Sequence, residues 1–125
     1  MGADQQSAIV MPPARGGLPA RTTKLVIDYI EDHLNEDVSL VELAELAGLS
    51  QFHLCRAFKQ ATGLPPHRYQ IKLRVERAKE LLEASHLPIS EIALAVGYDD
   101  QGQLARLFRK EAGTTPSQYR RDRQN

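Results

Sequence analysis

The chain carries the same pattern of residues twice. The first copy, residues 43–69, reads LAELAGLSQFHLCRAFKQATGLPPHRY, and the second, residues 92–119, reads IALAVGYDDQGQLARLFRKEAGTTPSQY. When one extra residue is allowed in the second copy, the matching pairs are Ala44 and Ala93, Gly48 and Gly97, Leu49 and Tyr98, Arg56 and Arg106, Phe58 and Phe108, Gly63 and Gly113, Pro66 and Pro116, and Tyr69 and Tyr119. Each copy predicts a short apolar helix, a glycine turn and a second helix with a basic face, which is the pattern of a helix-turn-helix.

Length and composition restrict the class of protein. A chain of 125 residues is enough for one domain or two very small lobes. The single cysteine, Cys55, excludes an internal disulfide and a cysteine cluster for zinc. No apolar run approaches the roughly 20 residues that span a bilayer, and the N-terminus lacks the layout of a secretion signal. We therefore expect a soluble, cytoplasmic protein.

Charge is separated along the chain although the formal net charge is zero. Residues 26–45 contain seven acidic side chains and no lysine or arginine, whereas residues 55–81 contain seven basic side chains against two acidic ones. From Arg106 to the end, six basic side chains stand against two acidic ones. Because phosphate affinity depends on the local patch and not on the sum, this polarity is compatible with nucleic-acid binding. The alternative is a set of solvated helix faces with balanced ion pairs.

Periodicity, caps and helix breakers predict an all-α chain of about seven helices. The expected helices are Thr23–Leu34, Ser39–Ala47, Ser50–Gly63, Pro65–Ala84, Ile89–Val96, Asp100–Ala112 and a short one from Pro116. In the first of them, the expected apolar stripe consists of Leu25, Tyr29, Ile30 and Leu34. Asn35 is expected to close that helix, because asparagine tolerates the left-handed conformation. Residues 1–21, which contain three prolines and three glycines, predict a flexible linker or tail.

The second copy resembles the signature of a known family. The residues that carry the resemblance are Ile92-Ala93, Gly97-Tyr98, Arg106, Phe108-Arg109-Lys110, Gly113, Thr115-Pro116 and Tyr119-Arg120. They are similar to the signature of the AraC/XylS family of bacterial transcription regulators, and the match extends over about Lys24 to Arg121. The resemblance implies two helix-turn-helix subdomains joined by a long linker helix. In such proteins the two recognition helices enter successive major grooves of double-stranded DNA, about 34 Å apart.

The resemblance also implies a function and partners. We expect residues 22–125 to form a sequence-specific DNA-binding domain with a first helix-turn-helix subdomain at 22–64, a linker helix at 65–85 and a second subdomain at 86–125. Members of the family are more often activators than repressors and act through RNA polymerase. A sensing and dimerising domain normally precedes the DNA-binding unit, and the proline- and glycine-rich start favours a fragment of a longer protein.

The first recognition helix offers side chains for reading bases. Its inward face is expected to hold Leu54, Ala57, Phe58 and Ala61. At about 100° per residue, its outward face and leading turn then present Gln51, Phe52, Cys55 and Arg56. Glutamine can pair with adenine and arginine with guanine, each through two hydrogen bonds. Phe52 could pack on a neighbouring helix or on a thymine methyl, and its place opposite the core stripe favours the thymine.

The second recognition helix is expected to be a weaker reader. Its candidate base contacts are Gln101, Gln103 and Arg106, although Arg106 could instead pair with an acid inside the fold. Gly102 stands where the first copy has Phe52 and contributes no side chain. Asp99 and Asp100 suit a helix N-terminus but repel phosphate. The candidate phosphate contacts of both copies are Ser50, Lys59, Arg68, Lys72, Arg74, Arg109, Lys110 and Arg120.

Other site chemistry finds little support in the sequence. Cys55 and His53 lack the further ligands that a metal site needs, and no orienting group completes a Cys–His nucleophile. Paired carboxylates at a workable spacing are absent as well, so we predict no catalytic site, no metal and no cofactor. The competing hypothesis is a protein-interaction module in which the acidic first and second helices dock a partner such as RNA polymerase. That hypothesis predicts weak DNA binding without sequence preference.

Overall fold

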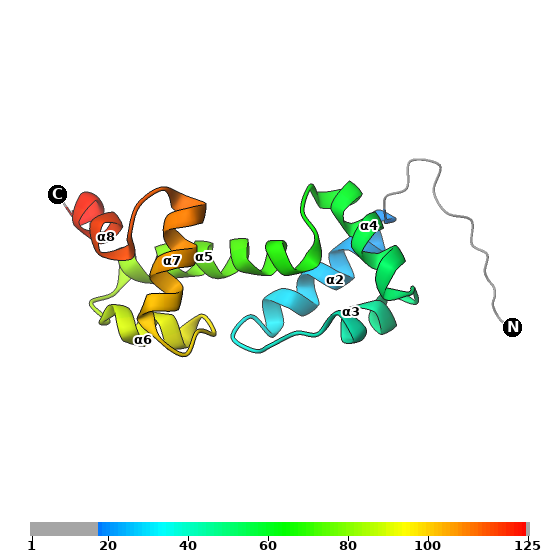
Figure 1. The fold of residues 1–125 in the computed structure, drawn as a ribbon, viewed down its shortest axis with the longest axis horizontal. Helices are drawn as coiled ribbons and strands as arrows, with labels where there is room; N and C mark the ends of the chain where they lie inside the picture. Colours follow the sequence, from blue (N-terminus) through cyan, green and yellow to red (C-terminus); the bar gives the residue numbers. More distant parts are fainter. Residues whose placement is uncertain (1–17, 125) are drawn as a thin grey trace, which may run out of the picture. The chain divides into compact units, whose positions relative to one another are not determined.

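The computed structural model describes residues 18–124, and within that range every regular element is a helix (Figure 1). The helices are α2 (Ala20–Asp32), α3 (Leu40–Ala47), α4 (Gln51–Thr62), α5 (Pro66–Ala84), α6 (Ile89–Ala95), α7 (Gln101–Ala112) and α8 (Pro116–Gln124). This confirms the predicted all-α fold with two helix-turn-helix units and a long helix between them. Most of the predicted tail, residues 1–21, lies outside the described residues.

The described residues form two compact units. The first comprises residues 18–28 and 40–66, and the second comprises residues 29–39 and 67–124. In the first unit α3 packs on α4. The buried side chains of these two helices are Leu43, Ala44, Leu54 and Phe58. Val26 of α2 is also fully buried. These are short apolar helices that leave their polar faces to solvent, as an amphipathic pattern predicts.

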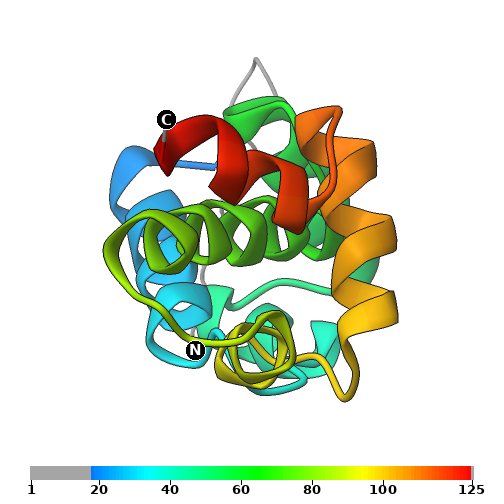
Figure 2. The same ribbon diagram turned by 90° about the vertical axis from the view of Figure 1, so that its left-hand side faces the viewer.

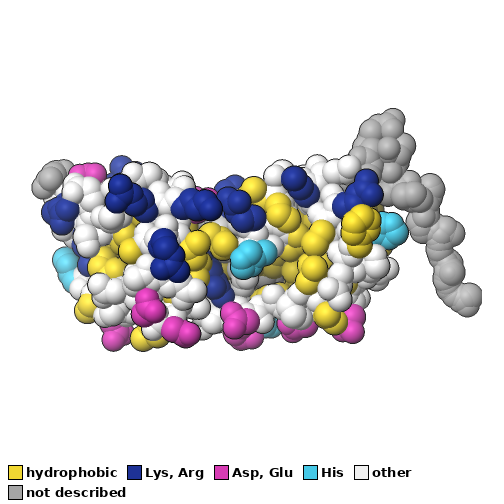
Figure 3. All heavy atoms as spheres, viewed as in Figure 1, with side chains coloured by type: hydrophobic (Ala, Val, Ile, Leu, Met, Phe, Trp, Pro, Cys, Tyr) yellow, Lys and Arg dark blue, Asp and Glu magenta, His cyan; other side chains and the backbone are white. Residues whose placement is uncertain are grey.

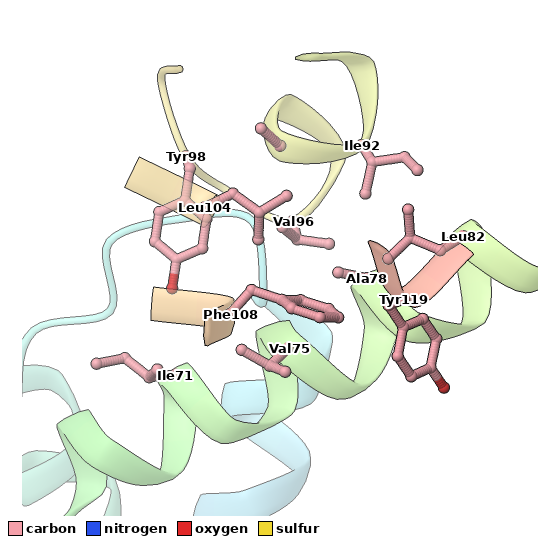
Figure 4. Close-up of a cluster of buried hydrophobic side chains, with 11 residues drawn as sticks. Ile71, Val75, Ala78, Leu82, Ile92, Val96, Tyr98, Leu104, Phe108 and Tyr119 are labelled. Carbon is pink, nitrogen blue, oxygen red and sulfur yellow. The ribbon is translucent and has the colours of Figure 1, made fainter. Parts of the chain in front are cut away.

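The second unit is built around α5. Its core contains Ile71, Val75, Ala78 and Leu82 from α5, Ile92 and Ala93 from α6, Val96 and Tyr98 from the turn, Leu104 and Phe108 from α7, and Tyr119 from α8 (Figure 4). Seen along α5, the helices α6, α7 and α8 lie around it (Figure 2). The spacing of the α5 residues is three or four, which places them on one face of a helix.

The buried face of α2 and the way in which this helix ends both differ from the prediction. The buried stripe of α2 contains Val26 and Ile30, both at 0% exposure, whereas Leu25 is 46% exposed. The helix ends at Asp32, and no non-glycine residue of the described chain has a positive φ, so Asn35 does not close it in the left-handed conformation. Backbone carbonyls beyond the helix end are instead bound by side chains of α5, as described below.

Candidate nucleic-acid interface

The second helix of the first unit, α4, is fixed at both ends by local contacts. Ser50 has an extended backbone, and its hydroxyl accepts a hydrogen bond from the backbone N–H of His53 at 3.1 Å. At the other end Gly63 has φ of 92° and donates its N–H to the carbonyl of Lys59. Ser50 is therefore the N-cap of α4, and Gly63 is its glycine C-cap. The caps fix the length of α4, while the fully buried Leu54 and Phe58 set the face that it turns inward.

The outward face of α4 combines an apolar ring with a cation. Phe52 is 67% exposed, so its ring does not pack into the core of the unit. The guanidinium carbon of Arg56 lies 5.5 Å from the centroid of that ring, within the range of a cation–π contact. Gln51 is exposed in the first turn, and Cys55 is partly buried beside it. The structure therefore brings the four predicted readers of the first unit onto the leading part of one helix.

The second unit repeats this arrangement in α7. Asp100 has an extended backbone, and its carboxylate accepts a hydrogen bond from the N–H of Gln103 at 2.8 Å. Leu104 and Phe108 are fully buried, whereas Gln101 and Arg106 are exposed and Gln103 is partly buried. Within residues 18–124 Arg106 makes no ion pair, so the predicted alternative of pairing inside the fold is not seen.

Replacing Asp100 with alanine is expected to remove the N-cap hydrogen bond of α7. The expected loss in the free energy of unfolding is about 1 kcal/mol, because one backbone N–H of the first turn loses its acceptor. Urea unfolding followed by circular dichroism measures it. Asp99→Ala is the matched control, since Asp99 is an exposed neighbour that does not provide the cap. Equal losses in both variants would contradict the assignment of the cap.

The predicted phosphate contacts divide into two groups. Ser50, Lys59, Lys72, Arg109 and Lys110 are exposed, and so is Arg68. Arg68 forms an ion pair with Glu111 at 3.3 Å, and the ammonium of Lys72 lies 5.9 Å from the ring centroid of Tyr69. Surface contacts of this kind contribute little stability, so the cations remain available to an anionic ligand.

Arg74 and Arg120 form the other group, because their guanidinium groups bind the protein's own backbone. Arg74 is 6% exposed and donates to the carbonyls of Leu34 and Glu36, both at 2.8 Å. Arg120 donates to the carbonyls of Leu82, Ser85 and Leu87 at 3.2, 3.3 and 2.8 Å. Buried or multiply bonded arginines stabilise the chain's own fold, so neither fits the predicted role of phosphate contact.

Two tyrosines that the structure buries, Tyr98 and Tyr119, were not assigned a role from the sequence. Tyr119 donates its hydroxyl to Glu83, lies edge-on to Phe108 with ring centroids 5.5 Å apart, and has Arg123 over its ring at 4.7 Å. Burial raises the pKa of the Tyr119 phenol, and the bond to Glu83 acts in the same direction. Tyr98 is 4% exposed, and its hydroxyl has no hydrogen-bond partner among the described residues. Burial raises the pKa of Tyr98, and Arg74 opposes only part of that rise.

Charge is distributed unevenly over the surface. On the face drawn in Figure 3, lysine and arginine gather on one edge of each unit, and acidic side chains gather on the opposite edge.

Among residues 18–124 no group of three or more His, Cys, Asp or Glu side chains is placed to hold a metal ion. None of the helices in the described part of the chain is both long enough and apolar enough to cross a membrane.

Known proteins are similar to this chain in sequence. A family profile described as a helix-turn-helix domain matches residues 43–122. The MmsAB operon regulatory protein of Pseudomonas aeruginosa is 37% identical over 106 residues, which cover 82% of this chain and 34% of that protein. The probable transcriptional regulator LumQ of Photobacterium leiognathi is 34% identical over 95 residues, which cover 76% and 38%. The chain thus spans about a third of the length of these curated relatives.

Solved structures agree with the sequence matches. The C-terminal domain of AraT, a response regulator from Geobacillus stearothermophilus, is 38% identical with a TM-score of 0.77, over 83% of this chain and 87% of that chain. An AraC-type regulator from Chromobacterium violaceum is 29% identical with a TM-score of 0.77, over 82% and 92%. The DNA-binding domain of AdpA, solved with a target DNA, is 31% identical with a TM-score of 0.75, over 81% and 91%. The chain belongs to the AraC family of helix-turn-helix, DNA-binding transcription regulators.

Proposed function

We propose that this chain reads a specific sequence of double-stranded DNA by placing α4 and α7 in two successive stretches of major groove. The observation that carries the proposal is the leading part of α4, where Phe52 and Arg56 are exposed on a helix whose opposite face carries the fully buried Leu54 and Phe58. Further support comes from the AdpA domain, which has the same fold and was solved with its target DNA. A helix of this kind contacts base edges with its N-terminal residues.

The two units differ in the side chains that they offer to bases. In α4 the proposed readers are Gln51, Phe52, Cys55 and Arg56, and in α7 they are Gln101, Gln103 and Arg106. Gly102 gives α7 no counterpart of Phe52, and the carboxylates of Asp99 and Asp100 at its start repel phosphate. We therefore expect α4 to discriminate between sequences more strongly than α7.

Phosphate contacts set the register and supply most of the salt-dependent affinity. We assign this role to Ser50, Lys59, Lys72, Arg109 and Lys110, which are exposed on or beside the two recognition helices or on the adjoining α5. Arg68 joins them if DNA competes with Glu111 for its guanidinium, a surface pair that water and salt already weaken.

Lys59→Ala is expected to weaken binding to all DNA sequences alike. Loss of one phosphate contact lowers the slope of log K against log salt by roughly 1, because about one fewer counterion is released. Fluorescence anisotropy with a labelled duplex between low and moderate salt measures the slope. Arg77→Ala is the control, since Arg77 lies about 180° around α5 from Arg68 and pairs with Glu80 at 3.0 Å. A slope that does not change in the Lys59 variant would remove Lys59 from the phosphate set.

We further propose that the DNA-bound protein activates transcription through contact with RNA polymerase. The support for this proposal is the exposed face of α3, where Val41 is 47% exposed and Glu42 and Glu45 are exposed as well. An exposed apolar residue with acidic side chains on the same helix suits a basic protein partner. The greater length of the relatives leaves room for a sensing and dimerisation domain that works with this unit. Transcription in vitro from a promoter with the selected site, with and without this protein, tests activation, and unchanged or reduced transcript would contradict it.

A further inference from the structure

Arg74 is the most deeply buried cation of the described chain. It projects from α5 to the loop that follows α2, where its Nε donates to the carbonyl of Leu34 and one terminal nitrogen donates to the carbonyl of Glu36. The side-chain amide of Gln70, one turn earlier on α5, donates to the same carbonyl of Glu36 at 3.0 Å. Two α5 side chains therefore bind the backbone of residues 34–36.

The flat face of the same guanidinium is covered by the turn before α7. Its central carbon lies 4.9 Å from the ring centroid of Tyr98. The backbone of Gly97 comes so close that a Cβ there would lie 2.7 Å from a terminal nitrogen of Arg74 and 3.0 Å from the Cα of Asn35. Gly97 also has φ of 97°, so a side chain is excluded at this position both by the space and by the backbone conformation.

Only an arginine fits these contacts together. A guanidinium is planar, so it can donate in its plane to two carbonyls while its face lies against an aromatic ring. An ammonium also donates and also attracts aromatic rings, but it has neither the flat face nor the fixed fork of donors that makes both contacts at once. Arg74 has no ion pair with a carboxylate within residues 18–124. Its buried charge is balanced by the carbonyl dipoles and by the Tyr98 ring, so removal of any of these leaves a poorly compensated charge.

The internal repeat indicates that Arg74 has an additional task. Gln70 and Arg120 each follow the tyrosine that ends a copy, and each binds backbone carbonyls of the segment that precedes the first helix of its own copy. These two residues tie the end of each copy to the segment before that copy. Arg74 differs, because it binds the segment that precedes the first copy and the Gly97–Tyr98 turn of the second copy at the same time.

That turn lies immediately before the reading end of α7. Tyr98 is followed by Asp99 and by Asp100, the N-cap from which α7 starts. We propose that Arg74 is a positioning residue for base reading by α7: it holds the Gly97–Tyr98 turn against residues 34–36 and thereby fixes the place of the helix's first turn. The inference rests on the proposed function, because it requires that Gln101, Gln103 and Arg106 read bases.

The test is a comparison of discrimination ratios in Arg74→Met, with Arg74→Lys as a second variant. For each protein, fluorescence anisotropy gives Kd for the selected DNA site, for the site with the α4 block scrambled and for the site with the α7 block scrambled. Wild-type protein is expected to lose affinity in both scrambled sites. In the Arg74 variants the ratio for the α7 block is expected to fall by about tenfold, towards 1, while the ratio for the α4 block stays within about twofold.

The discrimination ratios distinguish a loss of positioning of α7 from a loss of folded protein. A smaller active fraction raises every apparent Kd by the same factor, so both ratios would stay at the wild-type value, and that result would overturn the inference. Arg77→Met, on an exposed position of the same helix, should leave both ratios unchanged. Tyr98→Leu removes the ring that covers Arg74 and should reproduce the selective loss, so the test does not depend on the Arg74 variants being well folded.

The same data separate this inference from the proposed function. If wild-type protein already shows a ratio of 1 for the α7 block, α7 does not read bases, and the proposal for that helix is wrong together with the inference. If wild-type protein discriminates at both blocks and the Arg74 and Tyr98 variants do so equally well, only the positioning role is wrong.

Discussion

Phe108→Ala should lower the free energy of unfolding by about 3–5 kcal/mol, which is the usual cost of removing a buried phenylalanine and leaving its cavity. The Phe108 side chain is fully buried in the core of the second unit, where it lies edge-on to Tyr119 with a ring-plane angle of 74°. A small domain has only about 5–15 kcal/mol of stability in total, so this variant should be close to unfolding at 37 °C. Urea unfolding followed by circular dichroism measures the loss.

Phe52→Ala is a matched control for Phe108→Ala, because it removes the same side chain from an exposed place on α4. Its expected effect on stability is within about 0.5 kcal/mol, as for most surface substitutions. Its effect on DNA binding should be larger than its effect on folding. Comparable destabilisation by the two substitutions would contradict the placement of Phe52 on the surface.

Arg56→Ala should relax sequence discrimination at one base pair. The expected cost is about 1–3 kcal/mol at that base pair and little elsewhere, because a bidentate contact to guanine is lost while the phosphate contacts remain. Loss of the cation over the Phe52 ring also frees that side chain, which should slightly weaken the neighbouring position. Binding to a panel of duplexes, each changed at a single position of the selected site, measures the pattern.

Lys59→Ala provides the contrast to Arg56→Ala, since both residues are exposed and lie one turn apart on α4. The Lys59 variant should lose affinity for every duplex of the panel by a similar factor. If the Arg56 variant also lost affinity uniformly, Arg56 would be a phosphate contact and the assignment of readers in α4 would be wrong.

Much of the fold follows from short-range signals in the sequence. Gly63 ends α4 and Asp100 caps the start of α7, in agreement with the expected bounds of the two helices, because a cap needs only contacts within three or four residues. The repeated glycine turns and the proline at the start of α5 are local signals of the same kind. The extent of all the expected helices was therefore predictable to within a few residues.

The side of a helix that is buried was harder to predict where several apolar residues are close together in the sequence. In α2 both Leu25 and Val26 are apolar, and the sequence alone favoured a stripe through Leu25, which is in fact 46% exposed. In α4 Ala61 was expected to face inward but is exposed, because a methyl group carries little information about burial. Packing between helices decides such cases, and packing is a property of the tertiary structure.

Long-range contacts of the basic residues could not be predicted from the sequence. Arg74 and Arg120 belong to basic stretches and were therefore expected to bind phosphate. Their actual partners are backbone carbonyls at least 33 residues away in sequence, which have no residue-type signal. The repeat held one available clue, because Gln70 and Arg120 occupy equivalent positions after Tyr69 and Tyr119 and serve equivalent loops.

Selection of bound sites from a random double-stranded DNA library tests the central claim most directly. The purified chain is incubated with the library and excess competitor DNA, and the enriched sequences are aligned. We predict two enriched blocks about one helical turn, roughly 10 base pairs, apart, with the stronger block read by α4. A lack of enrichment at modest salt, with DNA bound equally at all sequences, would contradict the claim that this chain reads sequence.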